Sequence, residues 1–173
     1  ISQKVNTLSL EASVNDYLRA TFSLIGYDEA EIGSMPALSN PTTRAFQFSD
    51  GAITVDGSSY VDVTSFSLNY NNNLENDLYT MQSGSNMKEI EPQGREITAD
   101  IDVLYSSETN ATRSAKFKSG DTAALILTFT STEEIETGVY YKLQIEMPLA
   151  YITQANPQVG GPDRITQTLS VKA

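Results

Sequence analysis

Residues 97–105 read ITADIDVLY, and this stretch decides the fold class. Apolar side chains at positions 97, 99, 101, 103 and 105 alternate with polar ones at 98, 100 and 102. Such alternation places one set of side chains on each face of a β-strand, as in a half-buried antiparallel sheet. We therefore predict a strand here, with Asp100 and Asp102 on its polar face.

The same two-residue period extends along most of the chain. Residues 5–25 alternate on both sides of turn-type residues at 15–17, which predicts a hairpin or one long bent strand. The apolar phase shifts between 61–63 and 66–70, which predicts a bulge near Thr64–Ser65. Further strands are expected at 46–48, 53–55, 124–130, 140–147, 149–153 and 165–171, with an acidic turn at Glu133, Glu134 and Glu136.

One helix is predicted over residues 107–118. Ser106 or Ser107 can cap its start, Glu108 lies near its start, lysines lie near its end, and Gly120 follows. One helix among many short strands predicts a mainly β protein, an antiparallel sandwich or barrel with one flanking α-helix. A length of 173 residues suits a single domain over residues 1–173.

Two segments interrupt the strand pattern. Residues 26–45 lose the alternation and carry two prolines, which predicts an irregular arm or loop. Residues 71–96 form a polar, Asn-rich loop well beyond the roughly 12–15 residues at which loops are usually functional or disordered. This loop carries apolar side chains that a solvated linker would not need, and they pack either on another molecule or on the subunit's own core: Leu74, Leu78, Tyr79, Met81, Met87 and Ile90.

The composition excludes whole classes of function. The chain has no Cys, His or Trp, which removes cysteine nucleophiles, imidazole bases and metal sites built on thiolate or imidazole. A formal charge of −11 opposes binding to nucleic acid and to anionic membranes. No apolar run reaches the length of a transmembrane helix, and the first residues lack signal-peptide character.

Short chemical motifs carry little weight. Residues 85–88 match the S-x-x-K pattern of acyl enzymes, but they lie in the polar loop, and the companion motifs S-D-N and K-T-G are missing. The spacing of the aspartates matches no EF-hand loop. Spacing alone does not exclude a pair of carboxylates for glycoside hydrolysis, so an acidic hydrolase stays open as the weakest alternative.

Several runs of sequence resemble the tail tube proteins of long-tailed bacteriophages. They are ITVDGSSYVDVTSFSLNYNNNLENDLYTMQSGS at 53–85, IEPQGREITADIDVLYSSE at 90–108, KSGD at 118–121 and YYKLQIEMPLAYIT at 140–153. The resemblance covers roughly residue 46 to the C-terminus and is less distinct over the first 45 residues. It implies a β-sandwich or barrel flanked by one helix and a structural role rather than an enzymatic one.

By this resemblance, six copies would form a ring, their sheets would join into an inner barrel, and rings would stack into a tube that conducts the genome. Expected partners are further copies, other tail proteins and passing double-stranded DNA that is not specifically bound, with no membrane, cofactor or metal. The protein would belong to the virion tail and assemble in the host bacterial cytoplasm. The rival hypothesis is a monomeric adhesion or glycan-binding module.

The resemblance also implies roles for particular residues. The loop at 71–96 would dock on a neighbouring subunit or ring through the six apolar residues named above and Arg95, which could equally form a salt bridge within its own chain. Asp100 and Asp102 either line the lumen or face bulk solvent.

Overall fold

The computed structural model describes residues 3–26, 33–34, 37, 39–81, 89–158 and 164–173. Nine strands, one α-helix and a short 3-10 helix follow one another along these residues. Their bounds are β1 Gln3–Ser13, β2 Arg19–Gly26, η1 Phe48–Asp50, β3 Gly51–Val55, β4 Ser58–Tyr60, β5 Val63–Asn71, β6 Glu96–Leu104, α1 Ser107–Ser119, β7 Thr122–Glu136, β8 Val139–Gln158 and β9 Thr166–Lys172.

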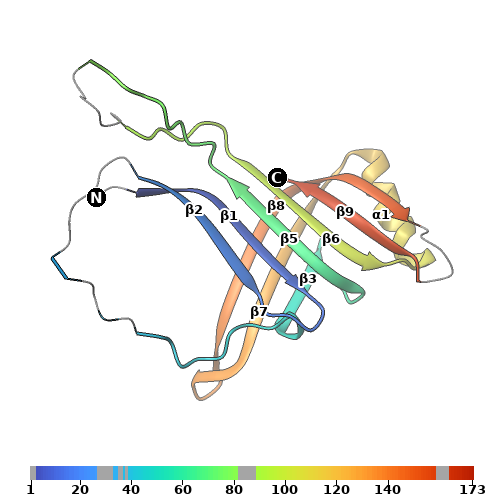
Figure 1. Cartoon of the computed structure of the whole chain (residues 1–173). Coiled ribbons are helices and arrows are strands. Elements are labelled where there is room, and N and C mark those ends of the chain that lie inside the picture. The colour runs from blue at the N-terminus through green and yellow to red at the C-terminus, as the bar shows by residue number, and fades with distance from the viewer. Residues whose placement is uncertain (1–2, 27–32, 35–36, 38, 82–88, 159–163) are drawn as a thin grey trace.

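All nine strands belong to one antiparallel sheet in the order β2-β1-β5-β6-β9-β8-β7-β3-β4. The sheet doubles over so that β1, β5, β6 and β9 form one layer and β7, β8 and β3 form the other (Figure 1). Strand β8 links the layers, because its first part pairs with β7 and residues 151–158 pair with β9. The expected mainly β fold with one helix is confirmed, and the expected sandwich is built from a single folded sheet.

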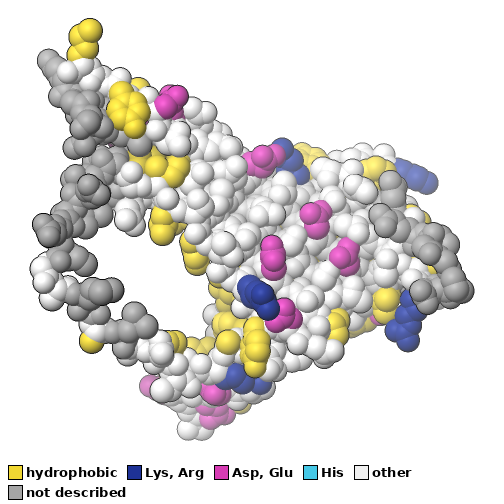
Figure 2. Space-filling model, in the orientation of Figure 1, with side chains coloured by type: hydrophobic (Ala, Val, Ile, Leu, Met, Phe, Trp, Pro, Cys, Tyr) yellow, Lys and Arg dark blue, Asp and Glu magenta, His cyan; other side chains and the backbone are white. Residues whose placement is uncertain are grey.

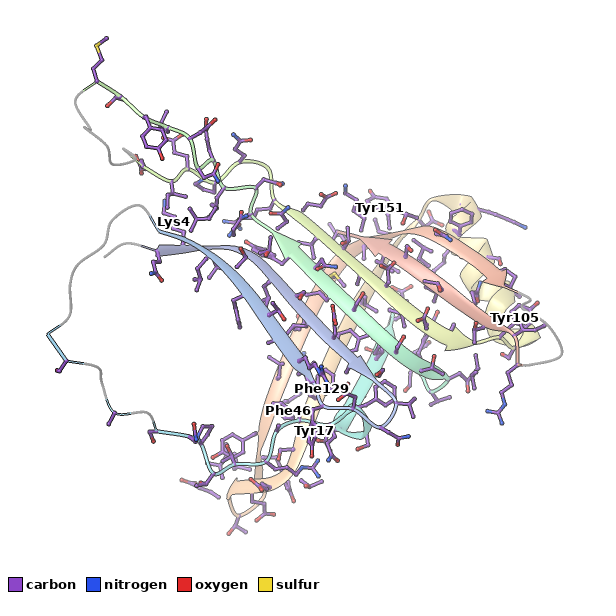
Figure 3. All side chains as sticks on the ribbon, in the orientation of Figure 1. Lys4, Tyr17, Phe46, Tyr105, Phe129 and Tyr151 are labelled. Atoms are coloured by element: carbon purple, nitrogen blue, oxygen red, sulfur yellow. The ribbon has the colours of Figure 1, made fainter. Side chains whose placement is uncertain are left out.

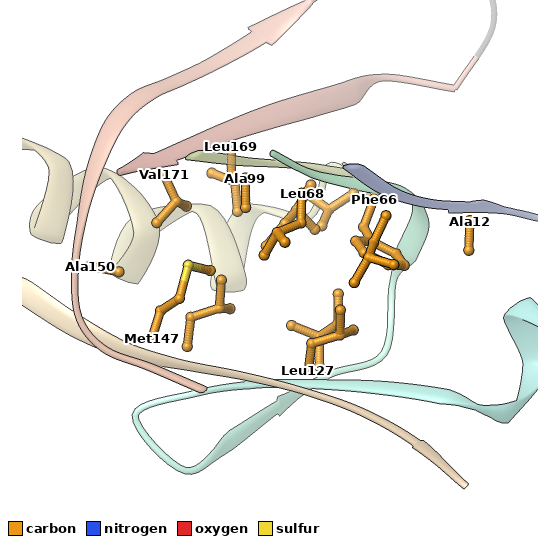
Figure 4. Packing of buried hydrophobic residues seen from close by; sticks show 14 of the residues in the cluster. Ala12, Phe66, Leu68, Ala99, Leu127, Met147, Ala150, Leu169 and Val171 are labelled. Atoms are coloured by element: carbon orange, nitrogen blue, oxygen red, sulfur yellow. The ribbon is translucent and has the colours of Figure 1, made fainter. Parts of the chain in front are cut away.

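The core lies between the two layers (Figure 4). Side chains of one parity on β5 and β6, such as Phe66 and Ile101, face side chains of β7 and β8, such as Leu127 and Met147. Phe129 is 1% exposed, and its ring lies 5.7 Å from that of Phe66 and 6.0 Å from that of Phe46, measured between centroids. Alternation therefore produces the core, because each strand turns its apolar face toward the opposite layer.

Several local predictions are confirmed. Residues 5–25 fall within the β1–β2 hairpin, and the register of β5 against β6 shifts between Val63 and Ser65, where the bulge was expected. The structure also places a two-residue hairpin turn between β3 and β4, where Asp56 and Gly57 both have the positive φ that such a turn requires. Gly120, with φ +69°, follows α1.

Two local predictions are wrong. The acidic residues 133–136 lie within β7, and the turn to β8 falls at Thr137–Gly138, where Gly138 has φ +79°. Glu134 pairs with Tyr140 and Glu136 pairs with Val139, so the β7–β8 pairing continues through the acidic residues. The strand tolerates these charges because the glutamate side chains are exposed to water. The strand expected at 46–48 does not form: Gln47 makes only an isolated β-bridge with Tyr17, and η1 begins at Phe48. The Asp50 carboxylate accepts the Gln47 N–H at 2.8 Å, which closes a turn in place of a strand.

Candidate assembly surfaces and polar sheet face

The outer side of the β1-β5-β6-β9 layer carries three cross-strand rows of polar side chains, which we call the polar sheet face. The rows are Ser9-Asn69-Thr98-Lys172, Glu11-Ser67-Asp100-Ser170 and Ser13-Ser65-Asp102-Thr168. These residues alternate with the buried ones, so the apolar period that builds the core also makes the opposite face polar. Figure 2 shows this face, on which uncharged polar side chains surround a few acidic ones.

Both aspartates predicted for the lumen lie on the polar sheet face. Asp102 is held in place, because Ser65 Oγ donates to Asp102 Oδ2 and Thr168 Oγ1 donates to Asp102 Oδ1, each at 2.6 Å. Asp100 is exposed one row away, in register with Ser67 and Ser170. The structure thus brings the two aspartates together on one face, and their place in a lumen stays a prediction.

The polar sheet face is acidic. Its rows hold three carboxylates, from Glu11, Asp100 and Asp102, and one cation, Lys172, whose Nζ lies 2.5 Å from Glu96 Oε1. At the edge of the face, Arg19 forms an ion pair with Asp16 at 3.2 Å. This arrangement leaves a net negative surface, which repels a polyanion.

Asp16 lies in the turn between β1 and β2. The backbone N–H of Tyr17 donates to Asp16 Oδ1 at 2.8 Å, and this hydrogen bond, with a smaller contribution from Arg19, lowers the pKa of the Asp16 carboxyl. The carboxylate therefore stays ionised to lower pH than an ordinary aspartate, and the turn keeps its hydrogen bond throughout the neutral range.

The base of the 71–96 loop is bound to β1, and we call residues 72–75 and 90–94 the loop stem. Leu74 and Pro92 form a β-bridge across the stem. The Leu74 N–H donates to Asn6 Oδ1 at 3.0 Å, and Lys4 Nζ donates to the carbonyl oxygen of Ile90 at 2.5 Å (Figure 3). These hydrogen bonds therefore hold both segments of the stem, 72–75 and 90–94, against the N-terminal part of β1.

The structure divides the predicted interface residues into two groups. Leu74 is 9% exposed and Ile90 is 0% exposed, so these two pack within the subunit, the alternative that the sequence left open. Leu78 is half-buried, whereas Tyr79, Met81 and Arg95 are exposed. Met87 lies outside the described residues. The exposed pair Tyr79 and Met81, which we call the loop tip, keeps its predicted role in assembly as a proposal.

We expect the Asn72→Ala substitution to loosen the loop stem. The Asn72 side chain donates to the Val5 carbonyl at 2.9 Å and accepts the Tyr70 hydroxyl at 2.7 Å. Each lost hydrogen bond costs about 1 kcal/mol locally, so amide hydrogen exchange at positions 74 and 75 should accelerate several-fold. The exposed neighbour Asn76 supplies the control, since Asn76→Ala should leave exchange unchanged. Equal exchange in both variants would show that Asn72 does not hold the stem.

A second exposed apolar surface lies on β2, one of the two edge strands of the sheet. Phe22 pairs with Leu8 and Leu24 pairs with Val5, so both side chains project on the core side of the sheet. They are nevertheless 56% and 55% exposed. We call Phe22 and Leu24 the β2 edge surface. Alternation at 18–24 is the sequence signal of this surface, and the same pattern is typical of core residues, so the sequence alone does not predict its exposure.

No group of three or more His, Cys, Asp or Glu side chains suited to a metal ion occurs among the described residues. Within that same part of the chain, no helix is long and apolar enough to cross a membrane.

Comparison with known proteins identifies a protein family that matches this chain. A family model described as phage tail tube protein matches residues 3–173. A search of curated protein sequences finds no significant match. A similar solved structure is the tail tube of phage SPP1, determined by solid-state NMR and cryo-EM, with 11% sequence identity and a TM-score of 0.40 over 96% of this chain and 72% of that one.

Proposed function

Because the chain belongs to the phage tail tube protein family, we propose that its copies form six-membered rings that stack into a tube and conduct the viral genome. The observation that carries this proposal is the polar sheet face. A conduit for DNA needs a wall that neither binds bases nor neutralises phosphates. A broad surface of hydroxyls, amides and carboxylates meets this need.

The charge of the polar sheet face supports its place on the lumen. Duplex DNA carries one negative charge per about 1.7 Å of its axis, and proteins hold it by neutralising those charges with Lys and Arg. On this face three carboxylates stand against one lysine that is already paired. DNA would therefore move along this surface without binding to it.

The ring itself would close through the edges of the sheet. An exposed edge strand is a liability in a monomer, because its backbone groups can pair with another chain. Ring symmetry uses such an edge by placing a different surface of the next copy against it. In our proposal the β2 edge surface makes this lateral contact, and the loop tip makes the contact between rings. The count of six comes from the resemblance to the family.

The proposal includes other tail proteins as partners at the two ends of the tube and assembly in the host bacterial cytoplasm. As a member of a tail tube family, the chain is a structural component of the phage tail. Electron microscopy of the concentrated purified protein tests self-assembly directly. Rings or tubes support the proposal, and a monomer that persists at high concentration contradicts it.

Reversing the charge of the wall tests its function. We expect assembled Glu11→Lys/Asp100→Lys protein to retain short duplex DNA at low salt and to release it as salt rises, because the added cations now displace counterions. Gel shift of assembled rings measures this, with wild type showing no retention. The control variant Asp121→Lys/Glu136→Lys makes the same charge change at exposed positions away from the polar sheet face. Equal retention by this control would argue that the polar sheet face is not the wall.

A further inference from the structure

An apolar cavity of about 310 Å³ opens beside the other edge strand of the sheet, β4. Its lining comes from η1, β3, β4, β5 and β7 and includes Phe48, Ile53, Tyr60, Val61, Leu127 and Phe129. Val61, between β4 and β5, is 84% exposed. The cavity is thus continuous with the core and open to the outside. The Val61 side chain beside it is left largely uncovered by the described residues.

This cavity and the loop lie at opposite ends of strand β5. Val63 and Phe66 near the start of β5 line the cavity, and Asn71 at the end of β5 leads into the loop. Figure 1 shows residues 72–81 of the loop extending beyond the β5 arrowhead, away from β3 and β4. Copies stacked head to tail along the strands would therefore bring the loop of one toward the cavity end of the next.

The loop tip has the chemistry that would fill such a cavity. Met81 is fully exposed and Tyr79 is 59% exposed. In an isolated subunit these apolar side chains stay in contact with water, which is unfavourable. A cavity of about 150 Å³ lined by apolar side chains already holds benzene. The cavity beside β4 is larger and therefore has room for a Met or Tyr side chain. The loop stem orders the base of the loop before contact, which reduces the entropy lost on binding.

We propose that the loop tip of each subunit inserts into the β4-side cavity of a copy in the adjacent ring. This interlock rests on the proposed tube and names the surface that receives the loop. It is a heterologous contact, in which two different surfaces of the same chain meet. Such a contact repeats without limit along an axis, as a tube requires.

Engineered cysteines test the interlock cleanly, because the chain has none of its own. We expect the Met81→Cys/Val61→Cys variant to form a ladder of disulfide-linked multimers on a non-reducing gel after oxidation or treatment with a short bifunctional thiol reagent. Each single-cysteine variant should stop at dimers. The matched control is Met81→Cys/Leu149→Cys, since Leu149 is also exposed, at 67%, but lies on β8 far along the chain from the cavity lining.

The outcomes separate the interlock from the tube. Tubes visible by microscopy with no ladder from Met81→Cys/Val61→Cys would overturn the interlock and assign the cavity to another occupant, while the tube itself would stand. An equal ladder from the Leu149 control would likewise overturn it. A wild-type protein that stays monomeric would overturn the tube first and the interlock with it.

Discussion

The Phe22→Asp/Leu24→Asp variant should remain a folded monomer at concentrations where the wild type forms rings. Both side chains are more than half exposed on edge strand β2. Full burial of such a side chain at the interface would stabilise the contact by about 1.5–3 kcal/mol, and a ring repeats this contact at every interface. Aspartate removes that gain and adds the cost of burying a charge without a partner, so assembly should be lost entirely rather than weakened. Analytical ultracentrifugation measures the outcome.

The matched control lies on the same strand. Thr21 and Ser23 alternate with the two apolar residues and face the other side of the sheet, and both are exposed. The Thr21→Asp/Ser23→Asp variant adds the same charge to the same edge, so it should still assemble. Rings from the Phe22→Asp/Leu24→Asp variant would show that the lateral contact lies elsewhere. Loss of rings in both variants would point to charge on the edge rather than to apolar contact.

The Phe129→Ala substitution should cost about 3–5 kcal/mol of folding stability, the usual range for truncating a buried phenylalanine. The Phe129 side chain is almost wholly buried. Its tilted contacts with Phe46 and Phe66 add stabilisation beyond that of the buried area. A Cβ atom added at Gly51 would lie 2.8 Å from Phe129 Cε1, so the backbone of β3 is fitted closely around this side chain. Because domains are stable by only about 5–15 kcal/mol, the loss should be a large part of the total.

Urea unfolding of monomeric protein measures this loss most clearly. The Phe22→Asp/Leu24→Asp background removes assembly, which would otherwise add concentration-dependent stability. In that background Tyr79→Ala serves as the control, since an exposed side chain should change stability by no more than about 0.5 kcal/mol. If Phe129→Ala and Tyr79→Ala gave similar midpoints, the centre of the core would lie elsewhere.

Much of the fold follows from local pattern. The alternation over 97–105 correctly predicts which side chains of β6 are buried, because a strand has only two faces and apolar residues occupy one of them. The phase shift at Thr64–Ser65 predicts the bulge for the same reason. The turn predicted at the acidic residues lies instead at Thr137–Gly138, because exposed strand ends tolerate charge and charge alone does not mark a turn.

The candidate surfaces followed from the sequence less completely. Alternation predicts that Asp100 and Asp102 lie on the polar face of β6, as the structure has them, whereas their place in a lumen stays a prediction. The sequence did not predict the β2 edge surface, because Phe22 continues the same alternation as Leu10 and Ala12, a pattern typical of core residues. The cavity beside β4 had no local signal, since its lining comes from five elements separated in the chain.

The sequence by itself determined strand periodicity, the polarity of each strand face, the acidic charge and the kinship with tail tube proteins, because all of these reside in the order of residues. Only the tertiary structure decided which apolar side chains are covered. Ile90 is buried whereas Tyr79 is exposed in the same loop, and Phe66 is buried whereas Phe22 is exposed in the same sheet. Burial depends on whether another part of the chain lies opposite, and that is set by contacts between residues far apart in sequence.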